Sequence, residues 1–204
     1  MNANVIEKKY NLDINQPNPI IVAAGGRDEL VELWKELGYK IGVEVGVQRG
    51  DFAEKIITGI PGLTYYGVDA WQCYKGYGDI IASRHGQSSF DRLYEEAKNR
   101  LEPLGAKLIR NWSTEAAKEF ADESVDFVYL DGNHQFEFVT ADIAAWLPKI
   151  KKEGMICGHD YARKNGHTLK LHVKDAVDGW TNAHETQLFV YYKQRSPNWL
   201  FFKK

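Results

Sequence analysis

Cysteines are scarce in this 204-residue sequence: there are two, Cys73 and Cys157, far apart along the chain. Two such residues provide neither a disulfide framework nor a cysteine-based zinc site, so we expect a reducing, cytoplasmic setting. No apolar run approaches the roughly 20 residues that a membrane span needs. Residues 1–16 also lack the apolar region of a signal peptide, and we expect neither a membrane segment nor secretion.

A strong excess of one charge is also lacking, since the formal net charge is -2. The sequence therefore offers no basic field for nucleic acid or an anionic membrane, although a net charge does not exclude a small basic patch. We expect a small molecule as the partner, with neither nucleic acid nor a membrane, and we leave a homo-oligomer open. Internal repeats and low-complexity segments are absent. The length suits one α/β domain.

Strand-like and helix-like patterns alternate along most of the chain. The polar start, to about residue 19, reads as irregular or adapted to a partner surface, and residues 72–88 read as a loop. The patterns predict helices near 27–38, 51–57, 90–101, 113–120, 139–150 and 169–182. They predict strands at 41–46, 65–70, 106–110, 125–130 and 154–158, and a closing hairpin of 187–192 and 199–202.

This alternation predicts a Rossmann-like, doubly wound α/β fold with a mostly parallel seven-stranded sheet and a C-terminal antiparallel hairpin. We expect one domain over 1–204: an N-terminal extension and helix (1–38), a ligand-binding core (39–161), and a final helix and hairpin (162–204). In such sheets ligands bind beyond the carboxyl ends of the strands. Polar residues gather at those predicted ends, in the segments 44–46, 69–71, 111–113, 131–134 and 159–160.

The first predicted strand runs into a turn that contains Glu44, Gly46 and Gly50. Glycines there let a ligand approach the backbone and the free N–H groups of the next helix, but a tight strand-to-helix turn explains them as well. Asp69 ends the second strand, where a carboxylate can accept both hydroxyls of a ribose or simply serve the turn. Trp71 could stack on a base or belong to the core.

Two segments, 127–134 (FVYLDGNH) and 154–161 (GMICGHDY), are specific enough to indicate a known protein family. Over about residues 40–161 the chain resembles class I S-adenosylmethionine-dependent methyltransferases. It looks most like the small metal-assisted O-methyltransferases of the catechol, sugar and macrolide types. The resemblance implies methyl transfer to a small-molecule acceptor, at a hydroxyl oxygen. It also implies a cofactor site made by Glu44, Gly46, Gly50, Asp69, Ala70, Trp71, Ser113 and Asp131, in which Ser113 could equally be a helix cap.

The same resemblance implies a metal site and a base. Asp131, His159 and Asp160 match the metal-binding positions, but the family usually has an acidic residue where His159 stands. Oxygen ligands suit magnesium, whereas imidazole suits manganese, iron or zinc, so metal use and metal identity stay open. Asp131 and Asp160 could also hydrogen-bond loop backbone. His134 occupies the position of the catechol type's basic lysine, and a histidine can take a hydroxyl proton near neutral pH; a structural role is the alternative.

Three other functions compete with this interpretation. An NAD-dependent oxidoreductase needs a G-x-G-x-x-G turn, which is absent. An amino-methylating DNA enzyme would carry an Asn/Asp-Pro-Pro-aromatic signature where this chain has Asp131-Gly-Asn-His134. A non-catalytic interaction module is disfavoured by the intact acidic strand ends. The acceptor is undetermined, although we expect residues 72–88 and 161–185 to set specificity, with Tyr74, Tyr77, His85, Tyr161, His167 and His172 among them.

Overall fold

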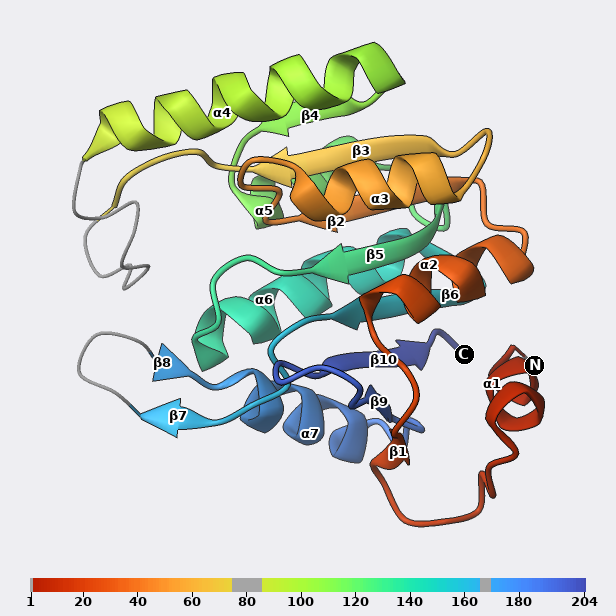
Figure 1. Cartoon of the computed structure of the whole chain (residues 1–204). Coiled ribbons are helices and arrows are strands. Elements are labelled where there is room, and N and C mark those ends of the chain that lie inside the picture. Colours follow the sequence, from red (N-terminus) through yellow and green to blue (C-terminus); the bar gives the residue numbers. More distant parts are fainter. Residues whose placement is uncertain (1, 75–85, 166–169) are drawn as a thin grey trace.

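The fold is seen in a computed structural model that describes residues 2–74, 86–165 and 170–204. Within these residues the main sheet has the order β1-β9-β10-β6-β5-β2-β3-β4 (Figure 1). Five of these strands are paired in parallel with one another: β2 (Ile41–Val45), β3 (Thr64–Asp69), β4 (Lys107–Arg110), β5 (Val125–Leu130) and β6 (Ile150–Gly158). The predicted parallel α/β architecture is therefore confirmed.

The C-terminal hairpin completes the sheet as predicted. It consists of β9 (Phe189–Tyr191) and β10 (Asn198–Phe202), and β10 runs antiparallel to both β9 and β6. These strands and the five parallel ones make up the expected seven. A short eighth strand, β1 (Ile20–Val22), pairs in parallel with β9 at the edge.

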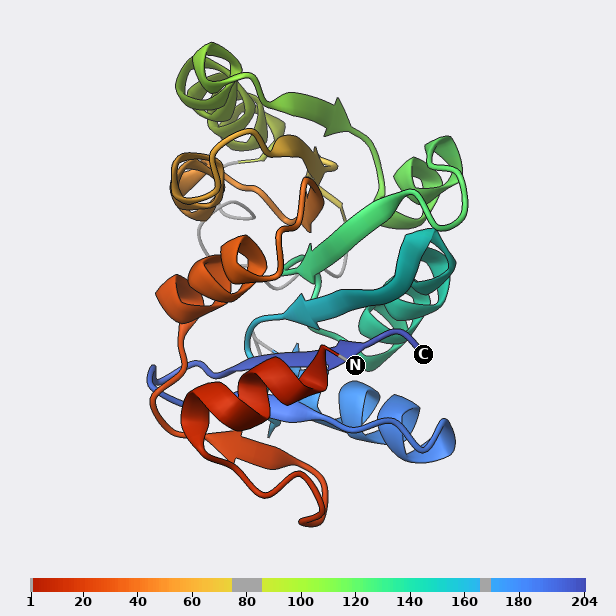
Figure 2. The same cartoon turned by 90° about the vertical axis from the view of Figure 1, so that its right-hand side faces the viewer.

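Helices cover both faces of the sheet (Figure 2). One face carries α2 (Arg27–Glu36), α3 (Asp51–Gly59) and α4 (Gln87–Leu101), and the other carries α5 (Ser113–Ala116), α6 (Phe136–Trp146) and α7 (Val173–Ala183). Strands buried on both faces need apolar side chains on both, and β5 has them: Phe127 stacks on Trp34 of α2 at 4.1 Å between ring centroids, while Val128 packs in the opposite cluster.

Several boundaries differ from the sequence-based expectations. The N-terminal segment contains a helix, α1 (Ala3–Tyr10), where we expected irregular chain. Its Ile6 is fully buried, so the helix is stabilised by tertiary packing that its polar composition does not reveal. β6 begins four residues before the predicted position, α7 begins at Val173 rather than near 169, and the 113–120 helix is α5 followed by the 3₁₀ turn Ala117–Glu119.

The region between β6 and α7 holds a further short hairpin that the sequence did not predict, β7 (Lys164–Asn165) with β8 (Lys170–Leu171). Of the residues expected to set specificity, Tyr77, His85 and His167 lie outside the described residues. In the described part of the chain, no helix combines the length and apolar character that crossing a bilayer requires.

The strand order decides where a ligand can bind. From β2 the chain moves outward through β3 and β4, and it then returns to β5 on the other side of β2. Strand order therefore reverses at β2, and the loops on its two sides part above the sheet to leave a crevice at the carboxyl edge.

Candidate functional site

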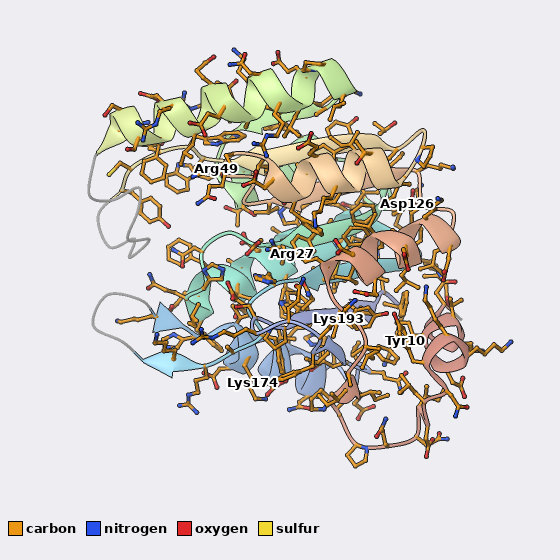
Figure 3. All side chains as sticks on the ribbon, viewed as in Figure 1. Tyr10, Arg27, Arg49, Asp126, Lys174 and Lys193 are labelled. Atoms are coloured by element: carbon orange, nitrogen blue, oxygen red, sulfur yellow. The ribbon has the colours of Figure 1, made fainter. Side chains whose placement is uncertain are left out.

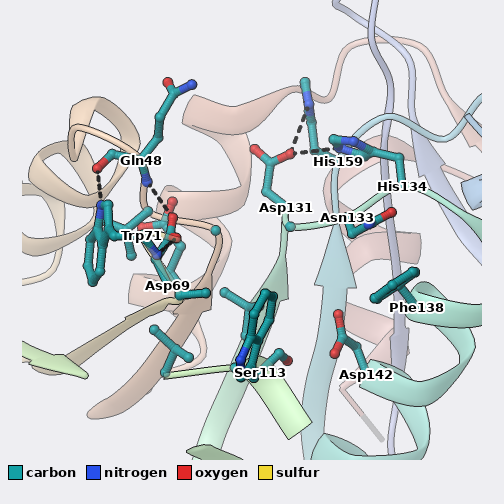
Figure 4. A pocket seen from close by; sticks show the side chains of 18 of the residues that line it. Gln48, Asp69, Trp71, Ser113, Asp131, Asn133, His134, Phe138, Asp142 and His159 are labelled. Carbon is teal, nitrogen blue, oxygen red and sulfur yellow. Dashed lines mark hydrogen bonds and ion pairs between the residues drawn. The ribbon is translucent and has the colours of Figure 1, made fainter. Parts of the chain in front are cut away.

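A cavity of about 550 Å³ lies at this reversal point (Figure 4). Its lining includes all but one of the residues that the sequence assigned to a site: Glu44, Gly46, Asp69, Ala70, Trp71, Ser113, Asp131, His134, His159 and Asp160. Gly50 is not part of the lining. It immediately precedes α3 with φ +87°, and a Cβ there would lie 2.8 Å from a methyl group of Leu101.

Gly46 shapes the floor of the cavity. Its φ is +91°, and a Cβ at this position would lie 2.1 Å from the carbonyl oxygen of Asp131. The turn after β2 therefore crosses directly against the end of β5, which only a glycine allows. The backbone N–H of Gly46 donates to Val68 at 2.8 Å, so the ends of β2, β3 and β5 are held together.

Asp69 is fixed at the end of β3 by backbone donors. Its Oδ1 accepts the N–H of Trp71 at 2.8 Å and its Oδ2 accepts the N–H of Gln48 at 3.0 Å (Figure 4). Burial raises the pKa of the Asp69 carboxyl, and these N–H groups oppose the rise. Each carboxylate oxygen can accept more than one hydrogen bond, so the turn role and ribose binding are compatible.

Trp71 is a core residue at the cavity wall. It is 1% exposed, its Nε1 donates to the carbonyl of Gln48 at 2.8 Å, and its ring packs against Tyr94 at 4.8 Å between centroids. These contacts hold the loop after β3 in place beside Asp69.

Glu44 is a buried carboxyl group on β2. It accepts a hydrogen bond from the hydroxyl of Tyr65. Burial raises the pKa of Glu44 to about 8, against the opposing effects of that hydrogen bond and of Arg27. At neutral pH the side chain is therefore mostly protonated and could ionise next to a bound cation.

Two acids and two histidines gather where β5 and β6 end. His134 Nε2 lies 3.5 Å from Asp131 Oδ1 and 3.2 Å from Asp160 Oδ2. His159 Nδ1 lies 3.7 Å and 3.4 Å from the same two oxygens. The structure thus brings the three expected metal residues together. One potential ligand atom each of Asp131, His134 and Asp160 lies within 4.8 Å of the other two, so this group has the imidazole of His134 where the sequence predicted that of His159.

The charge on His134 follows from these neighbours. Burial alone would lower the pKa of its imidazole, but hydrogen bonds and charge from Asp131 and Asp160 outweigh burial and raise the pKa to about 9. Burial also acts on Asp160, but the two histidines dominate and hold the pKa of its carboxyl well below its usual range. In the ligand-free protein at neutral pH, His134 is therefore an imidazolium and already carries the proton that a base would accept.

Arg27 is a site residue that sequence reasoning missed. It is the first residue of α2 (labelled in Figure 3). Its guanidinium forms an ion pair with Asp131, and its Nε donates to the hydroxyl of Tyr129 at 3.1 Å. The guanidinium also lies 4.8 Å from the centroid of the Phe52 ring. No local pattern marks this arginine, because its partner is 104 residues away.

Aromatic side chains also line the cavity. Tyr74 meets Trp112 edge-on at 5.0 Å between centroids and lies 6.4 Å from Phe138, and the Asn133 amide donates to the Tyr74 hydroxyl at 2.6 Å. Asp142 of α6 also lines the cavity. The sequence could have marked Asp142, since it is an acidic residue on the apolar stripe of Val139, Ile143 and Trp146.

Comparisons with known proteins agree with this arrangement. A family model described as a methyltransferase domain matches residues 43–161. The uncharacterized protein y4gI of Sinorhizobium fredii is 29% identical over 121 residues, which make up 59% of this chain and 12% of that protein. The chain therefore spans about an eighth of the length of that curated relative.

Solved structures share the fold at low sequence identity. A candidate caffeoyl-CoA O-methyltransferase from Staphylococcus aureus has a TM-score of 0.65 at 10% identity, with 98% of this chain and 90% of that chain covered. A candidate O-methyltransferase from Klebsiella pneumoniae has 0.60 at 12%, covering 100% and 89%. The methyltransferase PaMTH1 of Podospora anserina, solved with S-adenosylhomocysteine bound, has 0.58 at 12%, covering 86% and 77%.

At these identities the solved structures establish the fold alone, which is the class I methyltransferase fold. The family match extends over more than half of the chain, and it includes the ends of β2, β3, β5 and β6 that line the cavity. The chain therefore belongs to the family of methyltransferase domains.

Proposed function

We propose that this chain transfers the methyl group of S-adenosylmethionine to a hydroxyl oxygen of a small-molecule acceptor. The observation that carries the proposal is a single cavity with two ends of different chemistry. One end has a backbone-anchored carboxylate, Asp69, and the other has the cluster of Asp131, His134, His159 and Asp160. The O-methyltransferase names of the two structural neighbours from Staphylococcus aureus and Klebsiella pneumoniae support the choice of oxygen as acceptor atom.

The residues present fit the cofactor. Its sulfonium and ammonium groups are cationic, and the cavity presents the carboxyl groups of Glu44, Asp69 and Asp131. A volume of about 550 Å³ is within the usual range for a small-ligand site. We assign the ribose to Asp69, the methionine end to Glu44 and Gly46, and the adenine end to Ala70 and Ser113. Gly50 is left out because it does not line the cavity, and Trp71 acts through the loop that it holds.

The donor set also fits a divalent cation. Asp131 and Asp160 would hold it together with one imidazole, from His134 or from His159, and two carboxylates with one imidazole suit manganese, iron or zinc at least as well as magnesium. Such an ion would lower the pKa of an acceptor hydroxyl that it binds. Asp131 can take part although it pairs with Arg27, because Arg27 contacts Oδ2 and Oδ1 faces the histidines.

The protein's own residues have two tasks in the reaction. A sulfonium is a good leaving group, so the site must mainly align the acceptor oxygen with the methyl group and remove the hydroxyl proton. We propose that His134 takes this proton, which requires that the ring first release the proton that its raised pKa retains at neutral pH. His134 Nε2 faces both carboxylates, so the ring cannot ligate an ion through Nε2 and accept a proton there at the same time. If His134 ligates the ion, His159 is the second imidazole beside Asp160 that can take the proton.

Calorimetric titration with S-adenosylhomocysteine tests the cofactor assignment, and we expect binding in the micromolar range, about -8 kcal/mol. Turnover is then followed by release of S-adenosylhomocysteine over a panel of phenolic and sugar hydroxyls, in chelator-treated protein and after addition of Mn²⁺ or Mg²⁺. We expect Mn²⁺ to be at least as effective as Mg²⁺. Asp131→Asn should reduce the metal dependence more than the cofactor affinity. Absence of binding would refute the proposed function, whereas unchanged turnover after chelation would refute only the metal.

A further inference from the structure

Asp142 is an acidic residue in a place that disfavours one. It lies on α6 among the buried residues Val139, Ile143 and Trp146, and it is only 8% exposed. Its carboxyl group nevertheless reaches the cavity and lies between Ser113 and Phe138 (Figure 4). Burying a carboxyl group is costly unless it finds partners, so its position calls for a partner.

Among the described residues, the hydroxyl group of Ser113 is the hydrogen-bond partner of Asp142. Trp146 Nε1 donates to Ser113 Oγ at 2.9 Å, which leaves the Ser113 hydroxyl proton free to point at Asp142. Burial raises the pKa of Asp142 to about 6, and the hydrogen bond with Ser113 is the one opposing effect among the described residues, with no cation contributing. The carboxyl group is therefore mostly ionised at neutral pH and retains acceptor capacity toward the cavity.

The position of Asp142 along the cavity indicates which part of a ligand it meets. Asp69 ends β3, and the acid–histidine cluster lies on the β5 and β6 side of it. With the ribose at Asp69 and the methyl group at the cluster, the base must extend to the other side, toward β4. Ser113 begins the helix directly after β4, and it is the residue that contacts Asp142.

The surroundings of Asp142 suit a flat base. Trp112 and Phe138 are 37% and 41% exposed, unusually open for aromatic residues, and both line the cavity with Tyr74. Aromatic faces favour stacking, and a carboxylate among them accepts hydrogen bonds but donates none. Adenine carries an amino group at its six position, whereas a six-oxo purine presents an oxygen that a carboxylate repels.

From this placement we infer that Asp142 accepts a hydrogen bond from the exocyclic amino group of the cofactor's adenine and so selects adenine over six-oxo purines. Ser113 positions the carboxylate. This inference rests on the proposed function, because it presupposes an adenosyl ligand. It adds a specificity-determining residue from α6, an element that the sequence did not connect with the cofactor.

The test compares two ligands by calorimetry: S-adenosylhomocysteine and S-inosylhomocysteine, which has oxygen in place of the amino group. The wild-type protein should bind the adenosyl ligand about 10–100-fold more tightly, the usual effect of a hydrogen bond to a charged group. In Asp142→Asn the side-chain amide can donate to the oxo group, and the ratio should fall to about threefold or less. Glu137→Gln, an exposed acid on the same helix, is the matched control and should keep the wild-type ratio.

The outcomes separate this inference from the proposed function. If the wild-type protein binds neither ligand, the proposed function fails and the inference fails with it. If it binds S-adenosylhomocysteine and Asp142→Asn keeps the wild-type ratio, only the inference fails. Should Asp142→Asn not fold, the wild-type ratio decides, since equal affinity for the two ligands would show that no residue reads the amino group.

Discussion

The protonation of His134 can be tested without knowing the acceptor. Its ring is held between Asp131 and Asp160, and the pKa is raised from 6.5 to about 9. At about 1.36 kcal/mol per pKa unit, this corresponds to about 3 kcal/mol of preference for the imidazolium. Asp160→Asn removes one of the two carboxylates. We therefore expect the pKa of His134 to fall by roughly 1 unit or more in this variant.

The assay is a pH titration of the histidine ring nitrogens by NMR, with the His134 signal identified from a His134→Gln sample among the six histidines of the chain. Asp122→Asn is the charge-matched control, because Asp122 is an exposed acid paired with Lys149. A wild-type midpoint near 6.5, or the same midpoint in Asp160→Asn, would refute the reasoning. His134 would then be free to act as a base at neutral pH without help.

The same shift links stability to pH. A group whose pKa is raised on folding stabilises the folded state fully below its unfolded pKa, and that contribution is lost as the pH rises through the folded value. The contribution of His134 should therefore be complete below pH 6.5 and disappear through about pH 9. Denaturant unfolding across this window should show a smaller loss of stability in His134→Gln than in the wild-type protein.

Three further predictions follow from the cavity. Asp69→Ala should weaken S-adenosylhomocysteine binding by about 10–100-fold in calorimetry, and equal affinity would remove the ribose assignment. Burial raises the pKa of Glu44 to about 8, so folding retains a proton that the unfolded chain releases near pH 4.5. Stability should fall as the pH rises from about 4.5 to 8, and Glu44→Gln should reduce this fall by up to about 5 kcal/mol in urea titrations; parallel curves would contradict the burial. Gly46→Ala should cost on the order of 3 kcal/mol in thermal unfolding, from backbone strain plus a steric clash. Gly38→Ala, with φ +71° and no atom within 4 Å of the new Cβ, should cost less, and equal losses would refute the close approach.

The alternation of buried strands and amphipathic helices could be predicted from the sequence because each pattern depends only on residues that are close together along the chain. Within the strand Val125–Leu130, the residues from Phe127 to Leu130 are continuously apolar, as expected of a strand covered on both faces, and the helical stripe from Val139 to Trp146 follows it. Chain direction and the short connections then require parallel strands whose carboxyl ends share one edge. For that reason the sequence alone could predict that Asp69, Asp131 and Asp160 would lie near one cavity.

Short elements could not be read in the same way. The helix α1 and the strand β1 have too few residues to show a period, and they form because they pack on or pair with distant parts of the chain, such as β9. The hairpin of β7 and β8 is two residues long on each side, so pairing rather than pattern defines it.

The chemistry of the site was decided by the tertiary structure. The sequence determined which ionisable groups stand at the strand ends, but side-chain direction determined which of them touch. Arg27 reaches Asp131 from another helix, and Asp142 turns from an apolar stripe into the cavity. The charge of His134 depends on two carboxylates, one of them from a different strand end. Proton affinity depends on burial and on neighbours a few ångströms away, and only the folded chain sets those distances.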